Sequence, residues 1–312
     1  MTTVIVKLGG AAISDKQGIC QLAPDSALDA LLKQVHQAYQ ILASRGDKII
    51  LIHGAGSFAH PQAKQYRIKE GWALHDPEEV ARQKAGFAHT RKCLLRLHLA
   101  LMERLHALAI PVVSVSPFDH TELQDCDQSP SSCFDRVVQR VQQCLDLGFV
   151  PMLHGDTVLD QVRGCTVLSG DIVMYQLAMQ LPKVTRCVFI TDVDGIYNVD
   201  PKTDPTAQLI DHVQVAETQQ QQEEEEVEEK QTPVIVKEGI EQGHVVDVTG
   251  GMQGKVKWAK RIILDAQRNE LHVVICKSGS VESMHAVALD PLFHNDSIRV
   301  HPRMTVFTSA PP

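Results

Sequence analysis

The chain has 312 residues, 44% of them hydrophobic, and a formal net charge of −8, so it can bury a sizeable core as one large α/β domain or two lobes. No apolar run reaches the roughly 18 residues that span a bilayer, and residues 1–4 lack the basic start of a signal peptide, so we expect a cytoplasmic protein with no membrane partner. Residues 223–230 hold six Glu and one Lys, which leaves −3 for the remainder, and such a near-neutral body carries no electrostatic footprint for nucleic acid.

The first predicted element is a buried strand, residues 4–8, that ends in Gly9-Gly10. Leucines and valines then recur at helical spacing between Pro24 and Gly46, and a second strand, residues 48–53, ends in a second glycine turn. A helix over about 77–108, a strand over 112–116, a helix over 134–147 and a strand over 150–154 follow. This alternation predicts a three-layer αβα sandwich around an open, mostly parallel sheet.

The second half continues the alternation. It predicts a helix over 172–181, a strand over 187–191, a helix through Trp258 and Ile262, and a strand over 271–275. A polar, acidic stretch at about 217–232 is predicted to be a disordered loop. In open α/β sheets ligands bind at the carboxyl ends of strands, where the glycine-rich and acidic clusters fall, so we expect these clusters to line one cleft.

Cysteine and histidine usage argues against a metal centre. The eight cysteines form no C-x-x-C pair and lie mostly in apolar segments, so we expect reduced thiols. The histidines are scattered, and His98 and His106 on one predicted helix lack the neighbouring carboxylate or cysteine that a metal site needs. We therefore assign no residue as a direct metal ligand.

Two strand ends carry turns of a kind that binds phosphate. Where a strand opens into glycines ahead of a helix, backbone N–H groups can converge on an anion, and glycine lets its oxygens approach closely. The turn at Gly9-Gly10 follows Lys7, and the turn at 54–56 precedes His60. Two such turns indicate two phosphate-bearing ligands.

Six motifs, taken in chain order, resemble the amino acid kinase superfamily. They are Lys7-Leu8-Gly9-Gly10, His53-Gly54-Ala55-Gly56, His154-Gly155-Asp156, Ser169-Gly170-Asp171, Thr191-Asp192-Val193-Asp194-Gly195 and Thr249-Gly250-Gly251-Met252. Lys16 and the Ser57-Phe58-Ala59-His60-Pro61 run are similar to the isopentenyl phosphate kinases. The resemblance implies transfer of the γ-phosphoryl group of ATP to isopentenyl phosphate by a homodimer. It further implies an acceptor-binding lobe (1–183) and a nucleotide-binding lobe (184–312) that share one sheet.

The chemistry of such a transfer explains the residue types. A phosphate monoester already supplies an ionised oxygen nucleophile, so the obstacle is repulsion between phosphates. Each pair of unit charges 4 Å apart costs about 1 kcal/mol in water and about 4 kcal/mol at an effective dielectric of 20. Cations and N–H donors must offset this cost. Mg²⁺ is expected with ATP, bound chiefly through phosphate oxygens and water.

The resemblance assigns roles residue by residue. The expected catalytic residues are Lys7, Lys16, His60 and Lys255. The expected acceptor-binding residues are Ala55, His60 and Gly170. The expected nucleotide-binding residues are Lys7, Leu8, Gly9, Gly10, Ala11, Gly56, Asp192, Gly251, Gly254 and Lys255. Either Asp156 or Asp171 organises the lysines. Phe87, Leu94 and Val167 are candidates for the wall of a pocket for the isoprenoid tail, and each is equally well explained as a core residue.

The chain departs from the family pattern at one position, and its sequence is compatible with two other functions. Ala59 stands where the family usually has glycine, and an alanine there is strained if its φ is positive. The chain could instead phosphorylate another oxyanion acceptor, such as a phosphonate, UMP or glutamate. It could also be an inactive nucleotide-binding regulator, although the retained Lys7, Lys16, Lys255 and His60 count against that.

Overall fold

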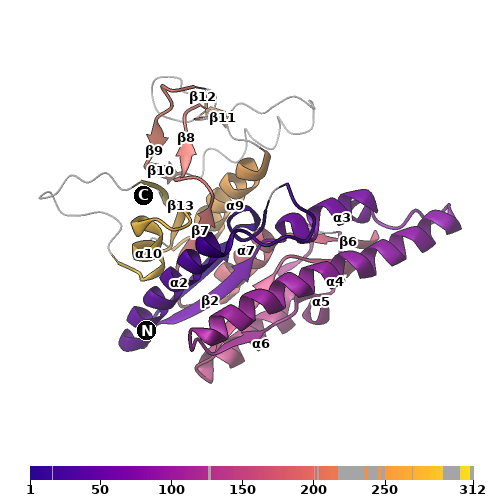
Figure 1. Cartoon of the computed structure of the whole chain (residues 1–312), viewed down its shortest axis with the longest axis horizontal. Coiled ribbons are helices and arrows are strands. Elements are labelled where there is room, and N and C mark those ends of the chain that lie inside the picture. The colour runs from indigo at the N-terminus through magenta and orange to yellow at the C-terminus, as the bar shows by residue number, and fades with distance from the viewer. Residues whose placement is uncertain are drawn as a thin grey trace, which may run out of the picture.

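An eight-stranded sheet forms the centre of the molecule (Figure 1). The computed structural model describes residues 1–15, 17–125, 128–199, 201, 204–216, 236–237, 245–246, 250–268, 270–290 and 303–309. In spatial order the strands are β10 (His212–Val215), β14 (Met304–Ser309), β13 (His272–Lys277), β7 (Val184–Thr191), β1 (Thr3–Leu8), β2 (Lys48–His53), β4 (Val150–His154) and β3 (Val112–Ser114). Strands from both halves of the sequence thus share one continuous sheet, as predicted.

Neighbouring strands of this sheet are parallel, except that β13 and β14 are antiparallel to each other. All six residues of β1 are buried, as expected for a parallel strand covered on both faces. The register pairs Leu8 with both His53 and Ile190, and His53 with His154. The carboxyl ends of β7, β1, β2 and β4 therefore meet at one edge of the sheet, so the motifs that follow these strands become neighbours.

Helices cover both faces of the sheet, and each face has its own apolar core. On one face α2 (Asp25–Arg45), α4 (Pro77–Ala107) and α10 (Val281–Val287) pack with Val4, Val6 and Leu8 of β1. On the other face α6 (Asp135–Asp146), α7 (Gly170–Gln180) and α9 (Gly250–Ala266) pack with Ile5. Because side chains alternate along a strand, Lys7 belongs to the same face as Ile5. The predicted αβα sandwich is confirmed.

Several short elements were not predicted from the sequence. A hairpin, β5 (Asp156–Asp160) with β6 (Gly164–Leu168), follows β4, and two small pairs form from β8 (Ile196–Tyr197) with β9 (Leu209–Ile210) and β11 (Val236–Lys237) with β12 (Val245–Val246). The short helices are α1 (Gly10–Ile13), η1 (Gly56–Phe58), α3 (His60–Gln65), η2 (Ile68–Glu70), α5 (Pro117–His120) and η4 (Ser131–Phe134). Segments this short carry too little periodicity to be recognised in a sequence.

Three expectations from composition can be compared with the structure. The acidic stretch at about 217–232 lies outside the described residues. Every cysteine in the described ranges is a free thiol. Among the helices that are described, none is both long enough and apolar enough to cross a membrane.

Candidate active site

The glycine turns after β1 and β2 pack directly against each other. A Cβ atom on Gly10 would lie 2.5 Å from the backbone nitrogen of Gly56, and one on Gly54 would lie 2.7 Å from the nitrogen of Gly10. Gly56 also has a φ of +50°, a conformation that strains other residues. Glycine is therefore required in these turns by the close approach of two backbones, whatever they bind.

Some backbone N–H groups of these turns donate hydrogen bonds within the protein, and others do not. The Gly9 N–H donates to the Ile190 carbonyl at 2.8 Å, and the Gly54 N–H donates to the Leu8 carbonyl at 2.8 Å. By contrast, the N–H groups of Gly10, Ala11, Ala55 and Gly56 meet no acceptor within the described residues. Free donors gathered at one place form an anion-binding concavity. Gly9, predicted to contact the nucleotide, has already committed its N–H to β7.

Lys7 lies in β1, two residues before the first glycine turn. It is 7% exposed. A Cβ atom on Gly170 would lie only 3.1 Å from Cε of Lys7, so glycine at this position leaves space for the lysine side chain. Its Nζ forms an ion pair with the Asp171 carboxylate at the start of α7 and lies 5.8 Å from the centre of the Phe189 ring.

The two aspartates considered as organisers of the lysines have separate partners. Ser169 Oγ accepts from the Asp171 N–H at 3.1 Å, and its hydroxyl donates to Asp171 Oδ2 at 3.4 Å, which helps to orient the carboxylate that pairs with Lys7. Asp156 instead accepts a hydrogen bond from Arg91 at 3.0 Å. Burial raises the pKa of Asp156 to about 7, against the opposing charge of Arg91. Asp171 is thus the aspartate that holds Lys7.

His60 is the first residue of α3 and keeps an exposed surface. Even so, the protein atoms around its ring lower its pKa, the charges of Lys7 and Lys255 lower it further, and Asp171 opposes them. Lys255 comes from α9, in the other half of the chain. The His60 ring therefore lies within electrostatic reach of cations from β1 and α9, at a place suited to receive an anion.

The remaining predicted residues fall on the same edge or outside the described ranges. Asp192 is exposed directly after β7, Gly251 lies in the first turn of α9, and a Cβ on Gly254 would meet nothing within 4 Å. Lys16 lies outside the described residues. Ala59 has a φ of −141°, so the alanine causes no strain in its loop.

A cluster of three buried histidines, not predicted from the sequence, lies behind the turns. The rings of His53, His98 and His154 have centroids 4.8 to 5.3 Å apart. Burial and neighbouring histidines lower the pKa of His53 well below its usual value and that of His98 to about 3, and burial lowers the pKa of His154 to about 4. The repeated His-Gly at the ends of β2 and β4 was the available sequence signal.

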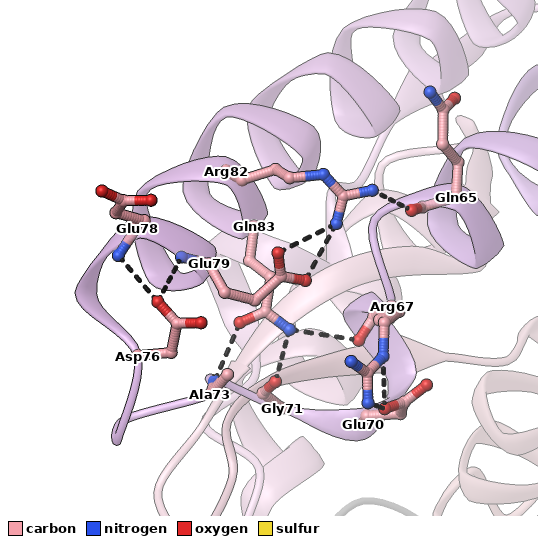
Figure 2. Close-up of polar contacts among 10 residues, drawn as sticks. All are labelled: Gln65, Arg67, Glu70, Gly71, Ala73, Asp76, Glu78, Glu79, Arg82 and Gln83. Atoms are coloured by element: carbon pink, nitrogen blue, oxygen red, sulfur yellow. Dashed lines mark hydrogen bonds and ion pairs between the residues drawn. The ribbon is translucent and has the colours of Figure 1, made fainter.

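Polar contacts hold α3, which carries His60, against the first turns of α4 (Figure 2). Arg82 donates to the Gln65 carbonyl at 2.7 Å. The side chain of Gln83, 2% exposed, donates to the Gly71 carbonyl at 2.8 Å and accepts from the Ala73 N–H at 2.9 Å. These bonds fix the segment between the two helices and hold the last residue of α3, Gln65, against α4.

An aromatic row continues from this segment. Trp72 lies 5.9 Å from Phe87, and Phe87 lies 6.1 Å from Phe118, measured between ring centres. The guanidinium of Arg91 lies 3.9 Å from the centre of the Phe118 ring. Of the three predicted wall residues, Leu94 is 1% exposed in the interior, whereas Phe87 and Val167 are half-buried. Phe87 and Val167 are thus still accessible as wall residues, and Trp72 and Phe118 were not predicted.

Comparison with known proteins agrees with this arrangement. The model of the amino acid kinase family matches residues 2–277. An isopentenyl phosphate kinase from Arabidopsis thaliana is 32% identical, with 91% of this chain and 89% of that protein aligned. One from Methanothermobacter thermautotrophicus is 29% identical over 81% and 84%.

A solved structure of an isopentenyl phosphate kinase superposes with a TM-score of 0.68 at 24% identity. The superposition covers 92% of this chain and 96% of the other. At that identity the superposition establishes the fold alone, whereas the family is established by the sequence matches.

Proposed function

The chain belongs to the amino acid kinase family and, within it, to the isopentenyl phosphate kinases; from this premise we propose that it transfers the γ-phosphoryl group of ATP to isopentenyl phosphate, giving isopentenyl diphosphate and ADP. The observation that carries the proposal is the pair of abutting glycine turns at the sheet edge where Lys7 and His60 converge, with N–H groups that meet no acceptor among the described residues. Two neighbouring anion sites suit a reaction between two phosphates.

The first turn is assigned to the ATP tail. The N–H groups of Gly10 and Ala11 are available to β- or γ-phosphate oxygens, and Lys255 on α9 supplies positive charge from the opposite side. Lys7, held by Asp171, contacts the transferring phosphoryl group. A lysine already fixed by an ion pair needs little reorganisation when charge moves along the transfer line, and such preorganisation is a major source of catalysis.

The second turn is assigned to the acceptor phosphate, with His60 and the N–H of Ala55 as donors. In the free protein the atoms around the ring and the charges of the nearby lysines lower the pKa of His60, so the ring is neutral at neutral pH and offers one N–H. A bound phosphate dianion acts in the opposite direction and favours the charged imidazolium. Acceptor binding is therefore coupled to proton uptake by His60.

The nucleotide side is assigned to residues 184–312, with Asp192, Gly251 and Gly254 near the nucleotide, and the acceptor side to residues 1–183. Mg²⁺ is assigned to the ATP phosphates and water. Asp171 is already engaged by Lys7, and in the described part of the chain no three His, Cys, Asp or Glu side chains are placed so that they could hold a metal ion. Lys16 as a transition-state stabiliser and a homodimer follow from the family resemblance alone. A cytoplasmic location stays the expectation from hydropathy.

The test is ADP release measured with isopentenyl phosphate, dimethylallyl phosphate, fosfomycin, UMP and glutamate. We expect turnover with the two isoprenoid phosphates. Turnover with UMP or glutamate and none with isoprenoid phosphates would overturn the proposal. ATP binding without turnover of any acceptor would identify the chain as a regulator instead.

A further inference from the structure

A chain of hydrogen bonds through two buried histidines ends on the backbone of the β2 turn. His98 Nε2 lies 2.9 Å from Ser114 Oγ, His53 Nε2 lies 3.0 Å from His98 Nδ1, and His53 Nδ1 lies 2.9 Å from the Gly54 carbonyl oxygen. The two histidines are 0% and 2% exposed. The chain thus links α4 and β3 to the loop that carries Ala55.

Only one arrangement of protons satisfies all three bonds. The Gly54 carbonyl can only accept, so the hydrogen is on Nδ1 of His53. Burial keeps both rings neutral, each with a single N–H. His53 Nε2 must then accept from His98 Nδ1–H, and His98 Nε2 must accept from the Ser114 hydroxyl. The tautomer of His53 is fixed by groups outside the turn.

This arrangement fixes the direction of a peptide group. In a trans peptide the C=O of one residue and the N–H of the next point in opposite directions, and the described residues contain no cis peptide bond. Since the Gly54 carbonyl points to the buried His53, the Ala55 N–H points the other way. The Gly54 N–H is also held, by the Leu8 carbonyl at 2.8 Å.

We propose that His53 is a positioning residue of the acceptor site: by holding the Gly54 carbonyl it directs the Ala55 N–H at the acceptor phosphate, and His98 and Ser114 keep it in the tautomer that can do so. This inference rests on the proposed function, in which the β2 turn binds the acceptor. His154 makes the matching bond to the Gly155 carbonyl at 3.0 Å. Its Nε2, however, has no hydrogen-bond partner in the described part of the chain, so the full relay belongs to the acceptor turn.

The kinetic test compares His53→Leu with His53→Asn. Leucine removes the donor, so the KM for isopentenyl phosphate should rise roughly tenfold to hundredfold, the effect of losing a hydrogen bond to a charged group, while the KM for ATP stays within about threefold. Asparagine can place an N–H near the position of Nδ1 and should restore most of the affinity. Equal losses for acceptor and ATP, or no rescue by asparagine, would overturn the proposal.

A control histidine, exposed rather than buried, lies on α4, the helix that carries His98. His106 lies 2.9 Å, through Nε2, from the Val112 carbonyl, at the amino end of β3 and away from the turns. His106→Leu should lower the melting temperature without changing either KM. A rise in the acceptor KM of this variant would show that any lost histidine–carbonyl bond has the same effect, and would contradict a specific role for His53.

A second measurement needs no turnover. Nitrogen-15 spectra of the imidazole rings at neutral pH, with the His53 signals assigned from their loss in His53→Asn, should show His53 as the Nδ1–H tautomer. An Nε2–H tautomer in an enzyme that turns over isopentenyl phosphate would overturn the role of His53 alone. Absence of that turnover in the unmodified enzyme would instead overturn the proposed function.

Discussion

At the scale of single residues, the ion pair between Lys7 and Asp171 is the central contact of the site. Both side chains are largely shielded from solvent, at 9% and 14% exposure, so their charges are screened less than those of a surface pair. Asp171 keeps the ammonium group in place before any phosphate arrives. The pair therefore orients the Lys7 ammonium group. Because the two charges cancel, the net positive charge of the site has to come from other groups.

Replacing Lys7 tests this role. Lys7→Met should lower kcat by roughly a hundredfold to a thousandfold, the effect of removing one preorganised donor to a developing charge. It also leaves Asp171 unpaired beside two phosphates, so Lys7→Met/Asp171→Asn should recover part of the loss. Steady-state kinetics of the two variants measure both effects.

A matched control for Lys7 lies at the other edge of the sheet. Lys48 is the first residue of β2 and pairs with Thr3, at the amino ends of the strands. Lys48→Met removes the same charge and should leave kcat unchanged. A large loss of kcat in this control would attribute the effect to net charge and contradict the assignment of Lys7.

The pH dependence of acceptor binding tests His60. Because its pKa is lowered in the free protein and a bound dianion raises it, the complex takes up a proton. The KM for isopentenyl phosphate should therefore increase with pH between the pKa of His60 in the free protein and its higher pKa in the complex, by at most tenfold per pH unit, and should level off above the latter. His60→Asn keeps an N–H donor but cannot titrate, so its profile should be flatter. Identical slopes in the two enzymes would contradict the coupling.

At the scale of elements, the contact between α3 and α4 depends on a glycine inside a helix. A Cβ on Gly86 of α4 would lie 2.0 Å from Cγ of Tyr66, the C-cap residue of α3. Glycine in a helix interior costs about 1 kcal/mol relative to alanine. Here that cost is offset by the close approach of the tyrosine, which lets α3 and its His60 lie against α4.

Substitution of this glycine should therefore destabilise the protein. In Gly86→Ala the overpacking cost of about 1–3 kcal/mol should exceed the helix-propensity gain, and displacement of α3 should raise the acceptor KM. Gly254→Ala in α9, where a Cβ meets nothing within 4 Å, should stabilise by up to about 1 kcal/mol. Urea unfolding of both variants measures the contrast, and stabilisation by Gly86→Ala would contradict this packing.

At the scale of the whole molecule, three buried neutral histidines make stability dependent on pH. The unfolded chain protonates these rings below about pH 6.5, whereas the folded protein holds the pKa of His154 near 4 and that of His98 near 3, with His53 also lowered. As the pH falls, the unfolded state therefore binds more protons than the folded state. The free energy of unfolding should decrease by up to about 1.4 kcal/mol per pH unit for each ring.

Urea unfolding between pH 7.5 and 4.5 measures this dependence. His98→Gln removes one titrating ring and should make the slope shallower. His75, which is exposed, provides the control, because His75→Gln should leave the slope unchanged. A wild-type stability that is constant down to pH 4.5 would show that the rings are protonated or hydrated in the folded protein.

The sequence by itself determined the layers of the fold and the location of the site. The predicted strands at 48–53 and 150–154 coincide with β2 and β4, because buried parallel strands appear as uninterrupted apolar runs bounded by turn residues. The glycine turns and polar clusters had to meet once those strands lay side by side, since parallel strands end at a common edge. Local sequence contained all the information that these conclusions need.

Only the tertiary structure decided which side chains act on one another. Lys7 and Asp171 are 164 positions apart, and His53 and His98 are 45 positions apart, so no local pattern distinguishes Asp171 from Asp156 or reveals the relay. The same holds for the approach of Tyr66 to Gly86. These contacts depend on where the helices cross the sheet, which is set by packing of whole elements, and packing is a property of the folded chain.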